Sequence, residues 1–438
     1  MRLAAVKAYL DFAGGGQWRE SAPPHITRED DRRLYTQLLR GAVRHKRLLE
    51  AEVARLSGRP LARLDAPVAA VALLGLLQVR FLKLPAHAVV YETVELVTAL
   101  GNGSAKGLVN GVLRAALRER ESGADPAAAY SLGVRTSHPD WLVERWQRRY
   151  GDKRAAAVCA ADDRFEGSTV RAETRRIPCA DLLERLAAEG VSASAHPLLP
   201  GAIQVARLGD LLRSPAFAEG LCYVQDVASQ VLTAWVAPHL GTRAVDLCAA
   251  PGGKLTHLLG LRAPGLWLVA ADSDPRRLAR VRENLARLRL PSLPLLAADG
   301  RALPFSPARP WDAVLLDVPC SATGMIRKYP ELKWRKHEDD LARYGETQRA
   351  LLDEAARHVA PGGLIVYSTC SLEPEENEEQ IAAFLSRRGD FARVPFTALP
   401  APHGLGAPPE ELLNAEGDLL VLPAGDRLGL YGALLRRV

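Results

Sequence analysis

Two cysteines lie in short polar loops whose composition suits nucleophilic chemistry. Cys320 lies in the loop 317–324 (Asp-Val-Pro-Cys-Ser-Ala-Thr-Gly), and Cys370 lies in the loop 368–377 (Ser-Thr-Cys-Ser-Leu-Glu-Pro-Glu-Glu-Asn). The thiolate is the reactive form of cysteine, and polar surroundings favour it. A lone cysteine after a strand is usually a small buried hydrophobe. Two of them in Gly-, Ser- and Thr-containing loops favour a reaction that uses both.

Four short apolar segments of the C-terminal half read as strands that each end in an acid. The four acids are Asp246, Asp272, Asp299 and Asp317. In a doubly wound parallel sheet the carboxyl ends of the strands meet at the edge where ligands bind. An acid at the end of the second strand is the group that binds ribose hydroxyls in such folds. The pattern therefore predicts a site for a nucleoside cofactor.

A Gly-rich turn after the first of these strands is expected to bind the cofactor backbone. Its residues are Cys248, Ala249, Ala250, Pro251, Gly252, Gly253 and Lys254. The next residues, 254–260, have helical spacing, so backbone N–H groups and a positive helix end would face the ligand. The turn lacks the first Gly and the Ser/Thr of a phosphate-binding P-loop, and it lacks the G-x-G-x-x-G of dinucleotide folds.

Thiols, an acid and a nucleoside cofactor together suit methylation of cytosine at C5. That carbon is a poor nucleophile until a thiolate adds to C6. The reaction then needs an acid near N3, a sulfonium methyl donor, and a second group that removes the C5 proton so that the thiolate can leave. We expect Lys254 and the helix N-terminus to help lower a thiol pKa.

The elements that position these loops are predicted from about residue 221 onward. Strands alternate with helices, which indicates a mostly parallel doubly wound α/β sheet. The tail ends in apolar runs that would add antiparallel strands. Residues 151–220 alternate helices and strands in a small α+β unit of an open-faced kind that often binds RNA.

The N-terminal third is predicted to be entirely helical. The segment 68–77 is apolar on nearly every side and predicts the buried central helix of a bundle, with further helices near 86–100 and 104–120. The Gly- and Asn-rich stretch 101–114 suits either an RNA backbone contact or a tight inter-helix turn. We therefore predict three domains, at 1–138, 139–219 and 220–438.

Composition points to a globular protein with a polyanionic partner. Residues 1–138 carry 20 Lys and Arg against 13 Asp and Glu, whereas the remainder carries 37 against 38. The basic excess in the N-terminal third suggests binding to nucleic acid, although a biased genome would also enrich Arg. Six widely spaced cysteines without a C-x-x-C pair argue against zinc and disulfide frameworks, so no metal is expected. The sequence predicts a cytoplasmic protein without membrane spans, and nothing in it requires more than a monomer.

These motifs resemble those of the bacterial small-subunit (16S) rRNA cytosine-C5 methyltransferases of the RsmB (Fmu or Sun) type, within the Nop2/Sun family. The resemblance rests on 246–254, 317–324 together with 326–330 and Lys333-Trp334, and 367–377. It covers nearly the whole chain. The N-terminal third is similar to the NusB-like helical RNA-binding domain, and the remainder implies a Rossmann-like class I methyltransferase domain after a small α+β middle domain.

The resemblance implies a role for each matching residue. Cys370 would be the nucleophile that adds to C6, and Cys320 would assist breakdown of the adduct. Asp317 would bind the flipped cytosine beside the cofactor. Residues 248–254 would bind the methionine end of S-adenosyl-L-methionine, Asp272 its ribose hydroxyls and Asp299 its adenine amine. The implied substrate is 16S rRNA, either naked or in an early assembly intermediate of the small subunit.

The sequence departs from the family pattern in the first cysteine loop. Val318 stands where Ala is usual, and Ala322 stands where Gly is usual. Ala322 would stiffen the loop or shift Cys320, because Gly reaches backbone angles that Ala avoids.

Two other functional classes also fit parts of the sequence. A cytosine methyltransferase acting on DNA would use Cys320 as the nucleophile, and tRNA is another possible substrate. A non-catalytic RNA-binding or antitermination module would need only the NusB-like third.

Overall fold

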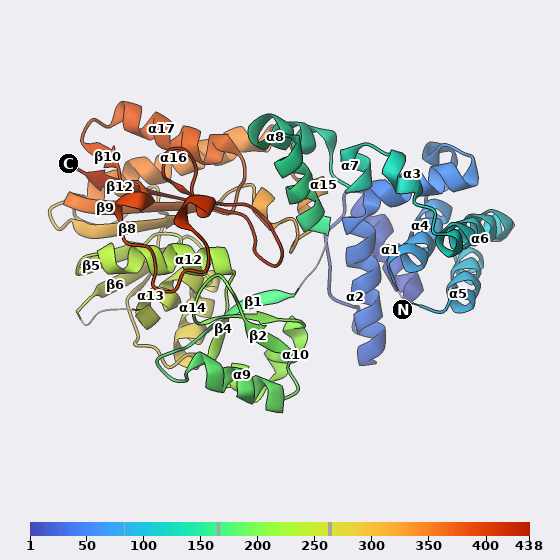
Figure 1. Cartoon of the computed structure of the whole chain (residues 1–438), viewed down its shortest axis with the longest axis horizontal. Helices are drawn as coiled ribbons and strands as arrows, with labels where there is room; N and C mark the ends of the chain where they lie inside the picture. The colour runs from blue at the N-terminus through green and yellow to red at the C-terminus, as the bar shows by residue number, and fades with distance from the viewer. Residues whose placement is uncertain (83, 164–166, 262–264) are drawn as a thin grey trace. The chain divides into compact units, whose positions relative to one another are not determined.

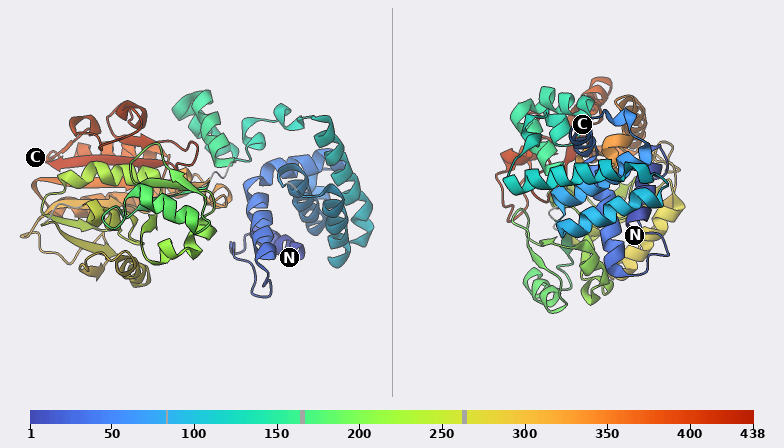
Figure 2. Two further views of the ribbon diagram at one scale, coloured as in Figure 1. Left: turned by 60° about the horizontal axis from the view of Figure 1, so that its bottom comes forward. Right: turned by 90° about the vertical axis from the view of Figure 1, so that its right-hand side faces the viewer.

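The computed structural model describes residues 1–82, 84–163, 167–261 and 265–438. Its contacts divide the chain into two compact units, shown in Figures 1 and 2. Unit 1 contains the described residues up to 163 together with 328–335, and unit 2 contains the rest. No helix among the described residues is long and apolar enough to cross a membrane. The domain boundaries at 138 and 219 stay predictions about sequence modules.

Unit 1 is helical, as the sequence predicted. Its helices are α1 (Arg2–Ala13), α2 (Glu29–Arg44), α3 (Lys46–Ser57), α4 (Ala66–Phe81), α5 (Ala86–Ala99), α6 (Lys106–Ser122), α7 (Leu132–Arg135) and α8 (Asp140–Asp163). Helix α4 is buried along nearly its whole length and packs against α1, α2, α3, α5 and α6. This confirms the prediction of a central apolar helix, which is stable only when neighbours cover every face.

A short segment from the second half of the chain also belongs to unit 1. It contains helix α15 (Leu332–Arg335), which lies at the C-terminal end of α2. Lys333 Nζ donates to the Arg44 carbonyl at 3.0 Å, and Trp334 Nε1 donates to the Val43 carbonyl at 2.8 Å. The last carbonyls of a helix lack intrahelical partners and carry its negative dipole end, so a cation there is favourable. Lys333 is buried, and its burial lowers its pKa to about 8.

Unit 2 contains a small antiparallel sheet in the order β2-β3-β1-β4. Its elements are β1 (Ser168–Ala172), α9 (Cys179–Ala188), β2 (Ala193–Ala195), β3 (Ala202–Val205), α10 (Leu208–Arg213), α11 (Pro215–Ala218) and β4 (Cys222–Val224). The sequence assigned the start of the cofactor domain to 220. Strand β4, which begins two residues after that position, pairs with β1, with Tyr223 opposite Arg171 in the ladder.

The large sheet of unit 2 has the order β10-β12-β9-β8-β5-β6-β7, and β11 pairs with β12. Its strands are β5 (Arg243–Asp246), β6 (Trp267–Asp272), β7 (Leu295–Ala297), β8 (Trp311–Asp317), β9 (Val359–Thr369), β10 (Phe391–Arg393), β11 (Leu419–Val421) and β12 (Leu430–Arg437). Strands β5 to β9 are parallel, and β10, β11 and β12 pair antiparallel. The predicted doubly wound sheet with antiparallel closing strands is confirmed.

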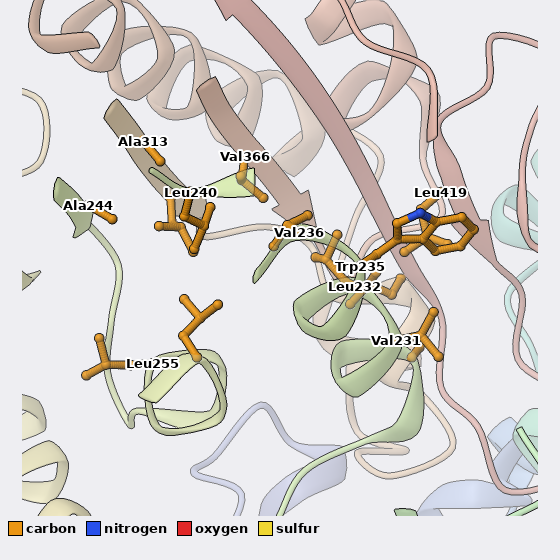
Figure 3. Packing of buried hydrophobic residues seen from close by; sticks show 14 of the residues in the cluster. Val231, Leu232, Trp235, Val236, Leu240, Ala244, Leu255, Ala313, Val366 and Leu419 are labelled. Atoms are coloured by element: carbon orange, nitrogen blue, oxygen red, sulfur yellow. The ribbon is translucent and has the colours of Figure 1, made fainter. Parts of the chain in front are cut away.

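Helices cover both faces of this sheet (Figures 1 and 2). One face packs on α12 (Val227–Val236), α13 (Gly253–Leu261) and α14 (Pro275–Arg287), and the other packs on α16 (Asp340–His358) and α17 (Glu378–Arg387). Figure 3 shows Trp235 of α12 beside Leu419 in the hydrophobic core on the face that α12, α13 and α14 cover. Burial on both faces explains why the central strands are almost continuously apolar. It leaves the carboxyl ends of the strands as the place where polar side chains gather.

The Lys333 contact generates a stability prediction. Replacing Lys333→Met keeps the length of the side chain but leaves the Arg44 carbonyl, and that of Thr136 at 3.4 Å, without this donor. We expect unit 1 to lose about 2–4 kcal/mol of unfolding free energy. The measurement is hydrogen exchange of the α2 amides in urea, because the two units need not unfold together.

Lys106→Met is the matched control. Lys106 pairs with Glu95 at 3.0 Å on the exposed surface, and such pairs contribute at most about 1 kcal/mol. Equal losses for the two variants would contradict a special role for the buried lysine.

Candidate active site

The two predicted thiols meet at the carboxyl edge of the large sheet. Cys320 follows β8, Cys370 follows β9, and their Sγ atoms lie 3.1 Å apart in a partly buried setting. The loops are also joined by their backbones, because the Gly324 N–H donates to the Cys370 carbonyl at 2.9 Å. The sequence placed both thiols at one edge, and the structure brings them into contact.

The electrostatics of Cys320 differ from the expectation. Its hydrogen bond to Cys370, followed by its burial, raises the pKa of the Cys320 thiol well above its ordinary value. Lys254, which was expected to help lower a thiol pKa, instead pairs with Asp317, with Nζ 2.6 Å from Oδ2. The expectation is wrong for Cys320, because its hydrogen bond to Cys370 and its burial raise its pKa.

Asp317 lies between the cofactor turn and the second cysteine loop. Its Oδ2 pairs with Lys254, and its Oδ1 accepts a hydrogen bond from Ser368 Oγ at 2.9 Å. The side chain is 41% exposed, so the carboxylate remains accessible to a ligand. Two donors from different elements fix its orientation, which suits a group that must present an acceptor in one direction.

The turn 248–254 connects β5 to α13 as the sequence predicted. The Gly252 N–H closes the turn on the Ala249 carbonyl at 2.7 Å. Gly252 has φ +101°, a conformation that side chains with a Cβ rarely adopt. The peptide bond between Ala250 and Pro251 is cis. Burial raises the pKa of the Cys248 thiol, so this third loop cysteine is a poor candidate for a nucleophile.

The other two predicted cofactor acids lie in different environments. Asp272 is buried at the end of β6 and accepts hydrogen bonds from the Ala250 N–H at 3.2 Å and from Arg277 at 3.3 Å. It therefore ties the second strand to the turn. Asp299 lies two residues beyond β7, is partly exposed and is held by Arg301 Nη2 at 2.7 Å. A ligand that reached Asp299 would have to share it with that guanidinium.

Asp246 is a site residue that the sequence named only as the end of a strand. It is 2% exposed, and burial, together with the negative charge of Asp317, raises its pKa to about 7. The Cys248 N–H donates to its Oδ1 at 3.2 Å. Its position in the first motif was a usable signal, but its proximity to Asp317 was not visible in the sequence.

Residues of the small sheet also hold the cofactor turn. The buried Arg171 donates to the Gly253 carbonyl at 3.3 Å and to Gln225 Oε1 at 2.9 Å, and the hydroxyl of Tyr223 donates to the Pro251 carbonyl at 3.3 Å. No local sequence pattern identified these contacts. Among the described residues, no group of three or more His, Cys, Asp or Glu side chains could hold a metal ion.

Ala322, the residue in place of the usual Gly, has a left-handed backbone. Its φ and ψ are 61° and 32°, and it directly precedes a short 3-10 helix, Thr323–Met325. A left-handed conformation costs an L-residue roughly 1–2 kcal/mol. The sequence suggested that Ala322 would stiffen the loop or shift Cys320, and the structure gives this residue a strained backbone two positions after Cys320.

Three family models match separate stretches of the chain. The family model described as 16S rRNA methyltransferase RsmB/F matches residues 233–424. The NusB family matches residues 1–118, and the ferredoxin-like domain of RsmF/B-like methyltransferases matches residues 138–211.

Individual relatives match over nearly the whole length. The Ribosomal RNA small subunit methyltransferase B of Pseudomonas syringae pv. tomato is 36% identical over 100% of this chain and 97% of its own. The solved structure of PH0851 has a TM-score of 0.75 at 25% identity, covering 99% of this chain and 98% of that one. A methyltransferase homolog from Pyrococcus horikoshii has a TM-score of 0.57 at 25% identity, covering 70% and 98%.

The left-handed Ala322 predicts that Ala322→Gly relieves strain in the loop. We expect unit 2 to gain up to about 1 kcal/mol, because the conformational relief exceeds the entropy that Gly adds to the unfolded chain. The measurement is the change in thermal unfolding of this variant relative to the wild type. The control, Ala308→Gly, changes an exposed turn residue with negative φ and should lose up to about 1 kcal/mol. A loss at both positions would show that Ala322 is not strained.

Proposed function

The chain belongs to the family of 16S rRNA methyltransferases RsmB/F, and from this premise we propose that it transfers a methyl group from S-adenosyl-L-methionine to C5 of a cytosine in 16S rRNA. The observation that carries the proposal is the contact of two thiols, Sγ to Sγ 3.1 Å, at the sheet edge where Asp317 and the cofactor turn lie. A single catalytic cysteine would not require this pairing, whereas formation and breakdown of a covalent adduct can use both sulfur atoms.

The proposed reaction begins with the Cys370 thiolate. Its sulfur forms a bond to C6, and the electrons of the C5–C6 double bond make C5 nucleophilic. C5 then takes the methyl group, and the bond from that methyl to the sulfonium sulfur breaks, which leaves neutral S-adenosylhomocysteine. Removal of the C5 proton by a base restores the double bond and expels the Cys370 thiolate.

Asp317 and Cys320 would act at the first and the last step of this reaction. The open carboxylate of Asp317, oriented by Lys254 and Ser368, would contact the cytosine ring near N3. The Cys320 thiol, in contact with Cys370, would stabilise the departing sulfur by hydrogen bonding. The cytosine must leave its stack to reach these groups, because C6 lies between neighbouring bases in a helix.

The cofactor would lie along the carboxyl ends of β5, β6 and β7. Residues 248–254 would bind the methionine end, Asp272 the ribose and Asp299 the adenine amine. The buried position of Asp272 beside the turn supports its role, and Asp299 would act with Arg301 alongside it. Unit 1 would bind rRNA, either naked or in an early assembly intermediate, with the enzyme acting as a monomer.

The direct test uses labelled S-adenosyl-L-methionine and 16S rRNA that lacks its own modifications. Digestion to nucleosides and chromatography should place the label in 5-methylcytidine. Label in another nucleoside would refute the thiol mechanism, and label in tRNA or DNA but not in rRNA would change the substrate class.

The two thiols predict opposite phenotypes. Cys370→Ala should lower methylation by at least roughly 1,000-fold, because the covalent route is lost. Cys320→Ala should accumulate a covalent protein–RNA adduct, seen as a retarded band in a denaturing gel. An adduct that forms in Cys370→Ala but not in Cys320→Ala would exchange the two roles, as in the DNA-type mechanism.

Asp246 predicts a pH-dependent affinity for the cofactor. S-adenosyl-L-methionine carries a net positive charge, so it favours the ionised carboxylate. Since the pKa of Asp246 is about 7 in the free protein, the affinity should rise roughly 3- to 10-fold from pH 6 to pH 8. Calorimetry in buffers of different ionisation enthalpy measures the released proton. Asp246→Asn should flatten the profile, and an unchanged slope in this variant would exclude Asp246 as the titrating group.

A further inference from the structure

Glu376 is a buried carboxylate that contacts both cysteine loops. It lies within the second loop, 368–377, and its side chain has no exposed surface. Its Oε1 accepts hydrogen bonds from the Ser321 N–H at 2.8 Å and from Gln348 Nε2 at 2.9 Å. Its Oε2 accepts from the hydroxyls of Ser321 and Ser371. Four donors on one carboxylate compensate the loss of its hydration.

The donors are the direct neighbours of the two thiols. Ser321 follows Cys320 in the chain, and Ser371 follows Cys370. The two serine hydroxyls also lie 3.0 Å from each other. Glu376 therefore joins two loops that are 50 residues apart at the position next to each sulfur.

The charge of Glu376 acts on the Cys320 thiol. Burial raises the pKa of Glu376, whereas the two N–H groups that donate to Oε1 favour its ionised form, since an N–H donor has no acceptor role. A buried negative charge near Cys320 opposes a second negative charge there. The raised pKa of Cys320 includes this repulsion, after the larger effects of its hydrogen bond to Cys370 and its burial.

We propose that Glu376 is a positioning residue for the two thiols: it locks the cysteine loops together and keeps the shared proton on Cys320, so that Cys320 donates to a thiolate on Cys370. The inference deepens the proposed function and rests on it for the meaning of the thiolate. The same hydrogen bond would stabilise the Cys370 sulfur before it attacks and after it is expelled.

The test is thiol labelling of the full-length protein without RNA or cofactor. Iodoacetamide at pH 7 to 9, followed by peptide mass spectrometry, gives the ratio of alkylation at Cys370 to that at Cys320. The wild type should label Cys370 preferentially. Glu376→Gln should shift this ratio toward Cys320 by at least 10-fold and should slow diamide-driven formation of the Cys320–Cys370 disulfide. An unchanged ratio and disulfide rate would overturn the proposal.

A second buried glutamate separates positioning from general stability. Glu354 on α16 accepts from the Leu303 N–H at 2.9 Å and from His358 at 3.0 Å, and it is buried within the same unit. Glu354→Gln should lower thermal stability but leave the labelling ratio unchanged. A shift of similar size in this control would assign the effect to loosened packing and overturn the proposal.

A milder variant covers the case in which Glu376→Gln does not fold. Ser321→Ala removes one hydroxyl donor but keeps the backbone N–H bond to Glu376. It should shift the labelling ratio in the same direction by a smaller factor, and no shift would count against the proposal.

Methylation assays test the proposed function independently of the thiol-labelling ratio. Glu376→Gln should lower kcat by roughly 10- to 100-fold with the KM for S-adenosyl-L-methionine unchanged. If the wild type methylates no cytosine but its labelling ratio depends on Glu376, the proposed function fails and the thiol arrangement stands. If cytosine is methylated but the ratio does not change, only the role of Glu376 fails.

Discussion

The contact between two sulfur atoms requires the rest of unit 2 to hold two loops at a fixed distance. Cys320 and Cys370 belong to loops after neighbouring parallel strands, and a displacement of about 1 Å would remove their hydrogen bond. Loops are ordinarily the most mobile parts of a fold. Here the register of β8 and β9, from Ala313 opposite Leu364 to Asp317 opposite Ser368, brings the loop starts together. The buried polar network behind them then fixes the final distance.

The aspartates at the strand ends are partly or fully buried, and each needs compensation for its charge. Asp246, Asp272 and Asp317 lie at the ends of three parallel strands, and three carboxylates at one edge repel one another. Lys254 compensates Asp317, backbone N–H groups compensate Asp272, and Asp246 responds with a raised pKa. Of these three carboxylates, Asp317 has Lys254 as its ion-pair partner and Asp272 has Arg277, whereas the pKa of Asp246 is raised to about 7.

The sequence predicted what local patterns determine. Apolar runs that end in acids indicated the strand ends, and the parallel topology then brought Cys320, Cys370 and the four aspartates to one edge. The sequence did not show the partner of Lys254, the contact of Arg171 with the cofactor turn, or the role of Glu376. Each depends on a tertiary contact between segments dozens of residues apart, and residue spacing carries no information about such a pair. The pairing of β4 with β1 was missed for the same reason, since a three-residue strand has no periodicity of its own.

Unit 1 includes a segment from the second half of the chain, residues 328–335. The chain leaves unit 2 shortly after the Cys320 loop, caps helix α2 through Lys333 and Trp334, and returns to unit 2 before α16. Without the helical unit, a lysine and a tryptophan that are now hydrogen-bonded would lose their acceptors. Without this segment, the last carbonyls of α2 would lose their donors. The folding of the helical unit is therefore coupled, through eight residues, to the stretch of chain that follows the Cys320 loop.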